Sequence, residues 1–264
     1  MYAIINVTLK GIFRDRVFHG IMVLGLLFLF IPSAASLSMR QVTELSITLS
    51  LSLISFILLL LSVFLGSTSL WKDMERRYTY GVLSLPISRT SYLFGRFLGL
   101  VIFLIITSTA LATVATFAIK ISSGIYPSDR PIVWGWFFLA VVFATLKYIL
   151  IIALAMLLST VSTSFFLPIF GTISIFFASS ITQQVYEYVH SPASIKTVSP
   201  LFKVLASGLY YLLPNLTAFD LKINAIYRIA PQLSGLGITA IYFTVYTTIL
   251  LGASAVLLGR REIL

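Results

Sequence analysis

Residues 45–71 read LSITLSLSLISFILLLLSVFLGSTSLW and contain no charged side chain. As an α-helix this stretch would be about 40 Å long, more than the roughly 30 Å of hydrocarbon in a lipid bilayer. Five further segments are long and apolar enough to cross a membrane: residues 17–37, 94–119, 133–158, 165–189 and 236–259. The sequence therefore predicts an all-α polytopic membrane protein with six transmembrane helices in a single domain over residues 1–264.

The composition excludes several other classes of protein. Of the 264 residues, 59% are apolar and only 10% are charged, and the mean hydropathy is +1.03. A soluble domain has about a quarter of its residues charged, and a disordered chain has low hydrophobicity. The net charge of +10 does not indicate nucleic acid, because the cations are spaced between apolar runs rather than clustered. The absence of cysteine excludes disulfides and thiolate metal sites.

The distribution of Lys and Arg predicts the orientation, because cytoplasmic loops carry an excess of these residues. With the N-terminus inside, the cytoplasmic segments contain Lys10, Arg14, Arg16, Lys72, Arg76, Arg77, Arg89, Arg96, Arg260 and Arg261. The short outside loops contain Arg40, Lys120 and Arg130, and the long connection 190–235 adds four more. We therefore expect a multi-pass protein of a bacterial or archaeal cytoplasmic (inner) membrane with both termini in the cytoplasm.

Two segments outside the six spans are also predicted to be helical. Residues 1–16 place Ile5, Leu9, Ile12 and Phe13 on one face and polar residues on another, which is typical of an amphipathic interfacial helix. This helix is either an elbow that passes cytoplasmic movement to the first span or a plain anchor. In the outside loop 190–235, the apolar stretch 198–219 is interrupted by prolines and predicts a re-entrant or interfacial helical segment before span six.

The cytoplasmic loop after the second span is the densest polar feature. Residues 71–96 read WKDMERRYTYGVLSLPISRTSYLFGR, in which four aliphatic residues lie between charged residues and the start of the third span. A short helix docked on another protein needs both apolar area and charges. A helix lying on the membrane with its aliphatic residues in lipid is the alternative. Ser88, Thr90 and Ser91 are the candidate N-caps of the third span.

The loop resembles the corresponding loop in the membrane subunits of type 2 ABC transporters. In that family a Glu is followed by Gly-Thr-Leu, then by Pro-x-Ser-Arg, and then by Gly-Lys or Gly-Arg. This chain has Glu75, Gly81-Val82-Leu83, Pro86-Ile87-Ser88-Arg89 and Gly95-Arg96 in the same order. Val82 departs from the usual Thr. The interfacial helix, the six spans and the interrupted outside segment extend the resemblance to the whole chain.

The resemblance implies that residues 72–93 contain a coupling helix that docks on a separate cytoplasmic ABC ATPase subunit. The implied contact residues are Glu75, Arg76, Arg77, Gly81, Val82 and Leu83, while Pro86, Arg89 and Arg96 anchor the loop and the third span. It also implies a second permease copy or a paralogue, contact with membrane lipids, and sometimes additional envelope proteins. The chain has no Gly-x4-Gly-Lys-Ser/Thr motif, so we expect ATP and Mg²⁺ on the partner and no cofactor or catalysis here.

Within the spans, four residues are candidates for a substrate path. Lys147 lies near the middle of the fourth span, where a charge is costly and is commonly functional. It either meets an anionic substrate headgroup in a polar cavity or is capped by hydroxyl and carbonyl oxygens between helices. Gln183, Gln184 and Asn215 are indicated by the family, in which the fifth span and the following hairpin shape the exit. The neighbouring tyrosines Tyr210 and Tyr211 also fit an aromatic belt at the outer interface.

These observations favour the permease subunit of an ATP-driven ABC exporter. One alternative is an ABC-like membrane component that acts mechanically on envelope proteins without a transported substrate. A secondary transporter or channel would need intramembrane carboxylates or duplicated broken helices, and neither is visible in the sequence. No catalytic or metal-binding arrangement is predicted, since His19 and His190 fall on opposite sides of the membrane.

Overall fold

A computed structural model describes residues 2–37, 41–75, 88–125, 132–191 and 198–260. These described residues form helices, turns and short connections and contain no β-strand. Six helical segments are long and apolar enough to cross a membrane: Phe18–Ser36, Val42–Trp71, Arg89–Gly124, Trp134–Val161, Phe166–His190 and Leu233–Arg260. The predicted all-α polytopic fold with six spans is therefore confirmed.

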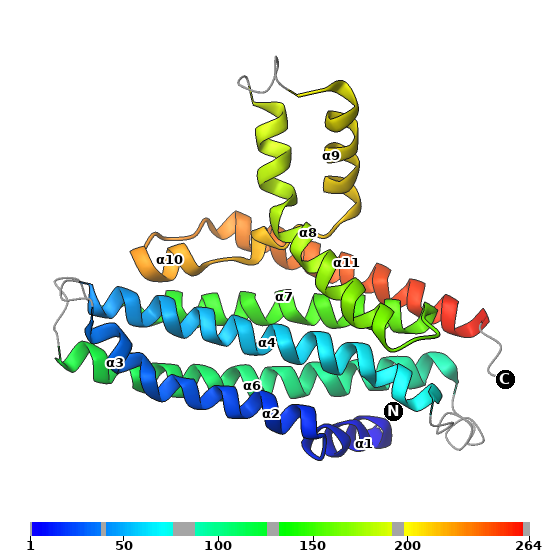
Figure 1. Cartoon of the computed structure of the whole chain (residues 1–264), viewed down its shortest axis with the longest axis horizontal. Helices are drawn as coiled ribbons and strands as arrows, with labels where there is room; N and C mark the ends of the chain where they lie inside the picture. Colours follow the sequence, from blue (N-terminus) through cyan, green and yellow to red (C-terminus); the bar gives the residue numbers. More distant parts are fainter. Residues whose placement is uncertain (1, 38–40, 76–87, 126–131, 192–197, 261–264) are drawn as a thin grey trace.

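Three long helices form the centre of the molecule: α4 (Val42–Glu75), α6 (Arg89–Ile125) and α7 (Trp134–Val161). They run side by side in Figure 1, and 72% of the span in α7 is buried within the protein. The contact between α4 and α7 is close because it is built from small residues. A Cβ atom on Gly66 would lie 2.8 Å from the Cβ of Ala155, and the Ser159 hydroxyl donates to the Ser67 carbonyl at 3.0 Å.

The first span is a series of three short helices: α2 (Arg16–Leu24), the 3₁₀-helix η1 (Gly25–Phe30) and α3 (Ile31–Ser36). Pro32 stands in the first turn of α3 and has no backbone N–H for the carbonyl of the preceding turn. A tighter 3₁₀ segment just before such a proline is a common way to continue the chain. The span is therefore helical throughout but not a uniform α-helix.

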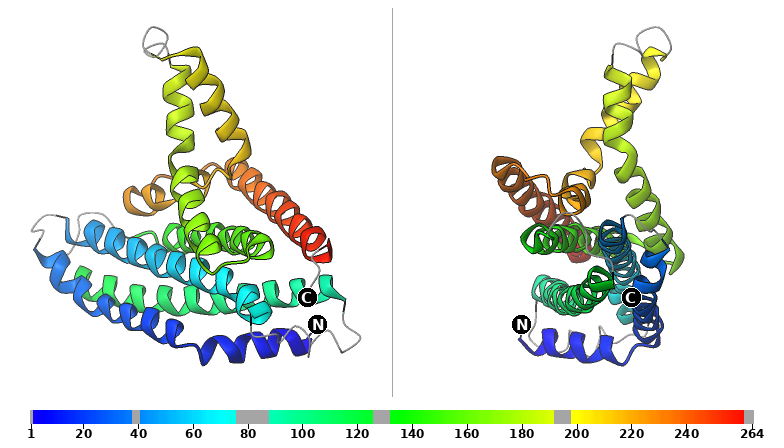
Figure 2. Two further views of the ribbon diagram at one scale, coloured as in Figure 1. Left: turned by 45° about the vertical axis from the view of Figure 1, so that its right-hand side comes forward. Right: turned by 90° about the vertical axis from the view of Figure 1, so that its left-hand side faces the viewer.

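The last part of the chain is more loosely attached. Helix α8 (Phe166–His190) changes direction about halfway along, and its far half pairs with α9 (Pro200–Leu212) in a hairpin that stands away from the other helices (Figures 1 and 2). The hydroxyls of Ser180 and Thr182 donate to the carbonyls four residues earlier, and bonds of this type commonly bend helices. The final helix, α11 (Leu233–Arg260), crosses obliquely.

The outside connection, in which a re-entrant or interfacial segment over 198–219 is expected, contains more than one helical part. Helix α9 packs against α8, while the chain that packs onto α4 and α7 comes later, in η3 (Thr217–Phe219) and α10 (Lys222–Tyr227). Phe219 and Ala225 are the buried contacts of this later segment. Helix α10 ends at Tyr227 and is capped by Arg228, whose φ of 61° is left-handed. Pro214 lies between α9, which stands outside the bundle, and the segment packed on it, whereas Pro200 is the first residue of α9.

Helix α1 (Tyr2–Phe13) lies at the same end of the bundle as the end of α4, the start of α6 and the end of α11 (Figures 1 and 2). Its buried residues are Ile4, Thr8 and Ile12, which face α6, whereas Lys10 and Arg14 are exposed. The buried face is therefore rotated from the predicted face centred on Ile5 and Leu9. The location of both described chain ends at one end of the bundle agrees with six crossings.

Candidate functional site

The predicted ATPase-contact loop falls largely outside the described residues. Glu75 is the last residue of α4, and α6 begins at Arg89. The other predicted contact and anchoring residues of the loop, Arg76, Arg77, Gly81, Val82, Leu83 and Pro86, lie outside the described ranges. Their contact with an ATPase stays a prediction. The described end of α4 and the start of α6 show which parts of the fold lie on either side of these residues.

The start of α6 is capped as its sequence indicates. The backbone N–H of Ser91 donates to the Ser88 hydroxyl at 3.2 Å, which makes Ser88 the N-cap among the three candidates. Arg89, the first residue of the helix, donates from Nη1 to the carbonyl oxygens of Leu258 and Gly259, each at 3.2 Å. These carbonyls belong to the last turn of α11. A residue near the end of the predicted coupling segment 72–93 therefore binds the end of the final span.

The next two turns of α6 bind α1. A Cβ atom on Gly95 would lie 2.9 Å from Ile4 Cγ2, and one on Gly99 would lie 2.8 Å from Thr8 Cβ. The two glycines, four residues apart, thus allow α1 to approach α6 closely. Arg96 donates to the hydroxyls of Tyr92 on α6, at 3.3 Å, and of Thr8, at 3.4 Å. Both arginines predicted to anchor the third span make contacts within the chain.

Lys147 is 8% exposed in the middle of α7, and its Nζ lies 5.1 Å from the centre of the Tyr148 ring. The Tyr148 side chain lies near Ser55 on α4. Two charged groups act on the amine across space, Asp220 with the opposite sign and Lys222 with the same sign. The sequence places no acid deep in a span near Lys147. Asp220 lies between η3 and α10, outside the spans, and its side chain is exposed.

A second polar cluster joins α8 to α11 through the connection that follows α9. The Asn215 side chain donates from Nδ2 to Gln183 Oε1 at 3.1 Å, and Gln183 donates from Nε2 to Glu187 Oε1 at 2.8 Å. The Asn215 backbone N–H donates to the hydroxyl of Tyr242 on α11 at 2.9 Å. Two of the predicted path residues, Gln183 and Asn215, are therefore in direct contact. Gln184 is exposed, and no described bond joins it to this cluster.

The tyrosines of the outside hairpin stack on one another. The rings of Tyr186 and Tyr210 are 4.1 Å apart and nearly parallel, and His190 lies 4.2 Å from Tyr186 on the same helix. Tyr211 contacts both tyrosine rings at their edges. This stack holds α8 and α9 together, a role that the sequence alone does not indicate.

Within the part of the chain that the structure describes, no group of three or more His, Asp or Glu side chains could hold a metal ion. The comparison with protein families gives a match over nearly the whole length. The model described as "ABC-2 family transporter protein" matches residues 2–263. No curated protein matches the sequence significantly.

Proposed function

The chain belongs to the ABC-2 transporter family, and on that basis we propose that it is the permease of an ATP-driven exporter that docks on a separate ATPase through residues 72–93. That it is a multi-pass membrane permease component of an ABC transporter follows from the family and from the six apolar helices. Permease subunits of this family are generally non-catalytic. The direction of transport, the docking residues and a second permease copy are the parts that we propose.

The observation that carries the proposal is the position of the loop between two helices of the central group. The segment 72–93 includes the end of α4, the connection between the two helices and the start of α6, and both helices pack on α7, the most buried span. Closely packed interiors transmit displacement because they have few voids to absorb it. A displacement of the loop would therefore move the adjoining ends of α4 and α6. Because both helices pack on α7, the movement would be passed on to the centre of the fold.

In the proposed mechanism, ATP with Mg²⁺ binds to the partner ATPase, whose closure displaces the loop. The permease then shifts between an inward-open state and a closed or outward-open state, and nucleotide binding biases this equilibrium. The path residues that we propose on this chain are Lys147, Gln183, Gln184 and Asn215. Their contribution would be to offer charge and hydrogen bonds to a substrate inside an apolar environment.

Purification of the chain from its native membrane tests the proposal first. We expect an ABC ATPase to co-purify, and Glu75→Arg or the double change Arg76→Glu with Arg77→Glu to release it or to abolish its stimulation. Lys10→Glu is the matched control, because Lys10 is an exposed cation on α1 and lies outside the loop. Absence of any co-purifying ATPase would refute the proposed docking.

The direction of transport needs a separate measurement. Cells that lack the protein would accumulate the substrate of an exporter, whereas they would be depleted of the substrate of an importer. Comparison of small molecules and lipids in cells with and without the chain therefore distinguishes the two directions. If no compound changes level while the ATPase still binds, the result would favour the mechanical alternative without a transported substrate.

A further inference from the structure

Arg89 occupies a position that its own helix does not favour. It is the first residue of α6, where the N-terminal end of the helix carries a partial positive charge that disfavours a cation. The last turn of α11 offers the opposite environment. Carbonyl groups at the C-terminal end of a helix carry partial negative charge. The Nη1 atom lies 3.2 Å from the carbonyl oxygens of both Leu258 and Gly259, so the guanidinium satisfies two of these groups.

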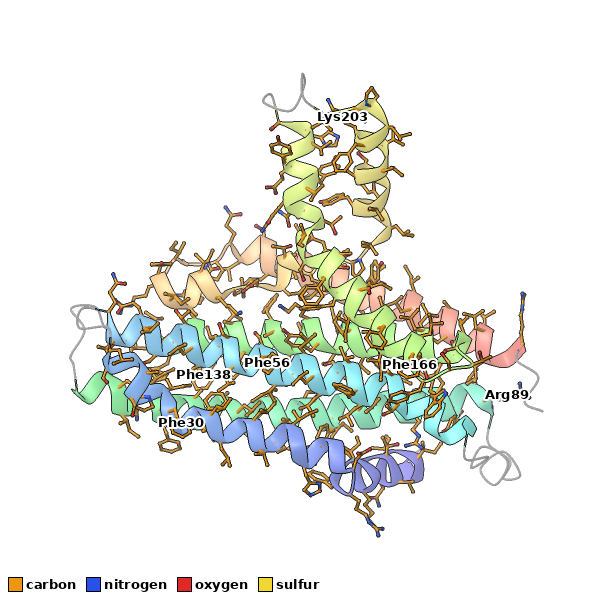
Figure 3. The ribbon with its side chains drawn as sticks, in the orientation of Figure 1. Phe30, Phe56, Arg89, Phe138, Phe166 and Lys203 are labelled. Carbon is orange, nitrogen blue, oxygen red and sulfur yellow. The ribbon has the colours of Figure 1, made fainter. Side chains whose placement is uncertain are left out.

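The contact joins segments that are distant in the sequence. Arg89 and its acceptor Gly259 are 170 positions apart, and Arg89 is labelled at the extreme end of the bundle in Figure 3, beside the end of α11. Leu258 is buried, so the last turn of α11 is packed there rather than free. Six and ten positions after Arg89, Gly95 and Gly99 bind α1. The start of α6 thus binds segments near both ends of the chain.

We propose that Arg89 is a positioning residue for energy coupling, which makes the cytoplasmic end of α11 move together with the loop that precedes α6. This inference rests on the proposed function, because the loop is moved by an ATPase only if that docking exists. Helix α11 also packs on α7 and on α6, and the bonds of Arg89 add described hydrogen bonds between α6 and α11 at this end. Without the contact to Arg89, displacement of the loop would reach α11 through side-chain packing alone.

The electrostatic origin of the contact predicts an order among substitutions. Lys keeps the positive charge and can donate to one carbonyl at a time, so Arg89→Lys retains part of the contact. Gln keeps a donor but removes the charge. Glu has nearly the same size as Gln but places a negative charge against carbonyl oxygens. A role that depended on side-chain volume alone would make the Gln and Glu variants equivalent, whereas the proposal makes Glu the more damaging.

The absence of native cysteine allows the contact to be measured directly on the whole chain. Spin labels on Phe94→Cys and Leu257→Cys, two partly exposed positions on α6 and α11, report the separation of the two helix ends. We expect one narrow distance distribution in the native background and in Arg89→Lys. We expect a broader and longer distribution in Arg89→Gln and the broadest in Arg89→Glu. This measurement needs no ATPase, and an unchanged distribution in both uncharged and acidic variants would overturn the inference.

Coupling is then measured as the permease-dependent stimulation of ATP hydrolysis by the co-purifying ATPase in liposomes. We expect a loss of at least about fivefold in Arg89→Gln, the lower end of usual coupling strengths, and a larger loss in Arg89→Glu. The amount of bound ATPase stays unchanged, as does stimulation in the control Arg14→Gln, which alters an exposed cation on the loop after α1. If all variants bind the ATPase and stimulate its hydrolysis equally, the inference about Arg89 would be overturned, whereas the proposed docking would stand. Failure of the native chain to bind any ATPase would refute the proposed function. The spin-label distances would then still show whether Arg89 holds the ends of α6 and α11 together.

Discussion

The two sides of the bundle are assembled in different ways. In α4 and α7, 56% and 72% of the apolar spans are buried within the chain, whereas in α8 and α11 the shares are 22% and 28%. Within a bilayer, apolar side chains gain little from leaving lipid, so helices associate through close packing of small residues and through hydrogen bonds. The α4–α7 pair has both features. Helices α8 and α11 therefore keep large faces for lipid or for another chain.

The surroundings of the glycines differ between the two sides of the bundle in the same way. Gly66 on α4 is the point at which the helix approaches α7, while Gly237 and Gly252 on α11 have open space where a side chain would be. The polar contacts differ in the same sense. Ser159 and Ser67 connect α4 and α7 directly, but α8 and α11 are connected through Asn215 in the chain between them. We infer that α4 and α7 form the fixed part of the permease and that α8 and α11 can change position against it.

The largest effect is expected from Gly66→Leu. The new side chain would have to displace the backbone of α7 at Ala155 and Ile152, and overpacking of this kind destabilises by 1–3 kcal/mol or more. We expect about 3 kcal/mol or more here, because both neighbouring positions are backbone or Cβ atoms rather than flexible side-chain ends. Thermal unfolding in detergent, followed by the loss of monodisperse protein, measures the effect.

Gly252→Leu is the matched control on α11. No atom lies within 4 Å of the added Cβ, and a leucine has a higher helix propensity than glycine by close to 1 kcal/mol. This variant should therefore be as stable as the native chain or slightly more stable. Equal destabilisation by the two substitutions would contradict the division into a fixed and a loosely attached part.

Lys147→Met is expected to have the next largest effect, in the opposite direction. A lysine at the centre of a span costs about 3 kcal/mol on insertion scales, and its neighbours on α7 recover only part of this. We expect the variant to be more stable by about 1–2 kcal/mol and to lose ATP-driven transport. Unchanged transport with normal protein levels would show that Lys147 does not serve the substrate.

Asp220→Asn tests where the stabilising charge for Lys147 originates. Asp220 precedes α10 in the outside segment and acts on the amine across space. The change should destabilise the native chain but leave the Lys147→Met background almost unaffected. An equal effect in both backgrounds would mean that Asp220 contributes through local contacts, such as its bond to the Lys222 backbone N–H at 3.1 Å.

The sequence predicts the parts of this fold that depend on local composition. Span number, the Ser88 cap and the helix ahead of the first span follow from apolar length, capping preference and amphipathic spacing, all of which act within a few turns. The Arg89 contact with Leu258 and Gly259 has no such local signal, because any helix end can accept from a cation. The same holds for Lys147 and Asp220, whose approach depends on how η3 and α10 pack on α7.

The outside connection shows a further limit. The prolines and polar residues of 198–219 indicate an interrupted helical segment, and α9 with η3 supplies one. Which part packs on the bundle could not be read from hydropathy, since Leu201 and Val204 of α9 are apolar yet more than 70% exposed, while Phe219 is buried. Membrane helices expose apolar residues to lipid, so hydrophobicity does not identify the interior as it does in a soluble protein.

Ser159→Ala is expected to have a moderate effect on the fixed side. It removes the bond to the Ser67 carbonyl, and hydrogen bonds between membrane helices contribute about 0.6 kcal/mol on average and at most about 1.7. Because Ser159 is fully buried, we expect a loss near the upper value, measured by thermal unfolding. Thr248→Ala on α11 is the control, since that hydroxyl donates to the carbonyl of its own helix at Thr244 and is exposed.

The smallest effect is expected in the bond between Gln183 and Asn215, and a double-mutant cycle with alanine at both positions isolates it. The pair is half-buried, and Gln183 also donates to Glu187, so water and a second partner compete for the same groups. We expect a coupling energy of about 0.5 kcal/mol in unfolding measurements. This bond joins α8 to the chain leading to α11. If α8 and α11 change position against α4 and α7, the bond must be weak enough to break during that movement. A value above about 1.5 kcal/mol, equal to the strongest bonds on the α4–α7 side, would place α8 in the fixed part and contradict the comparison.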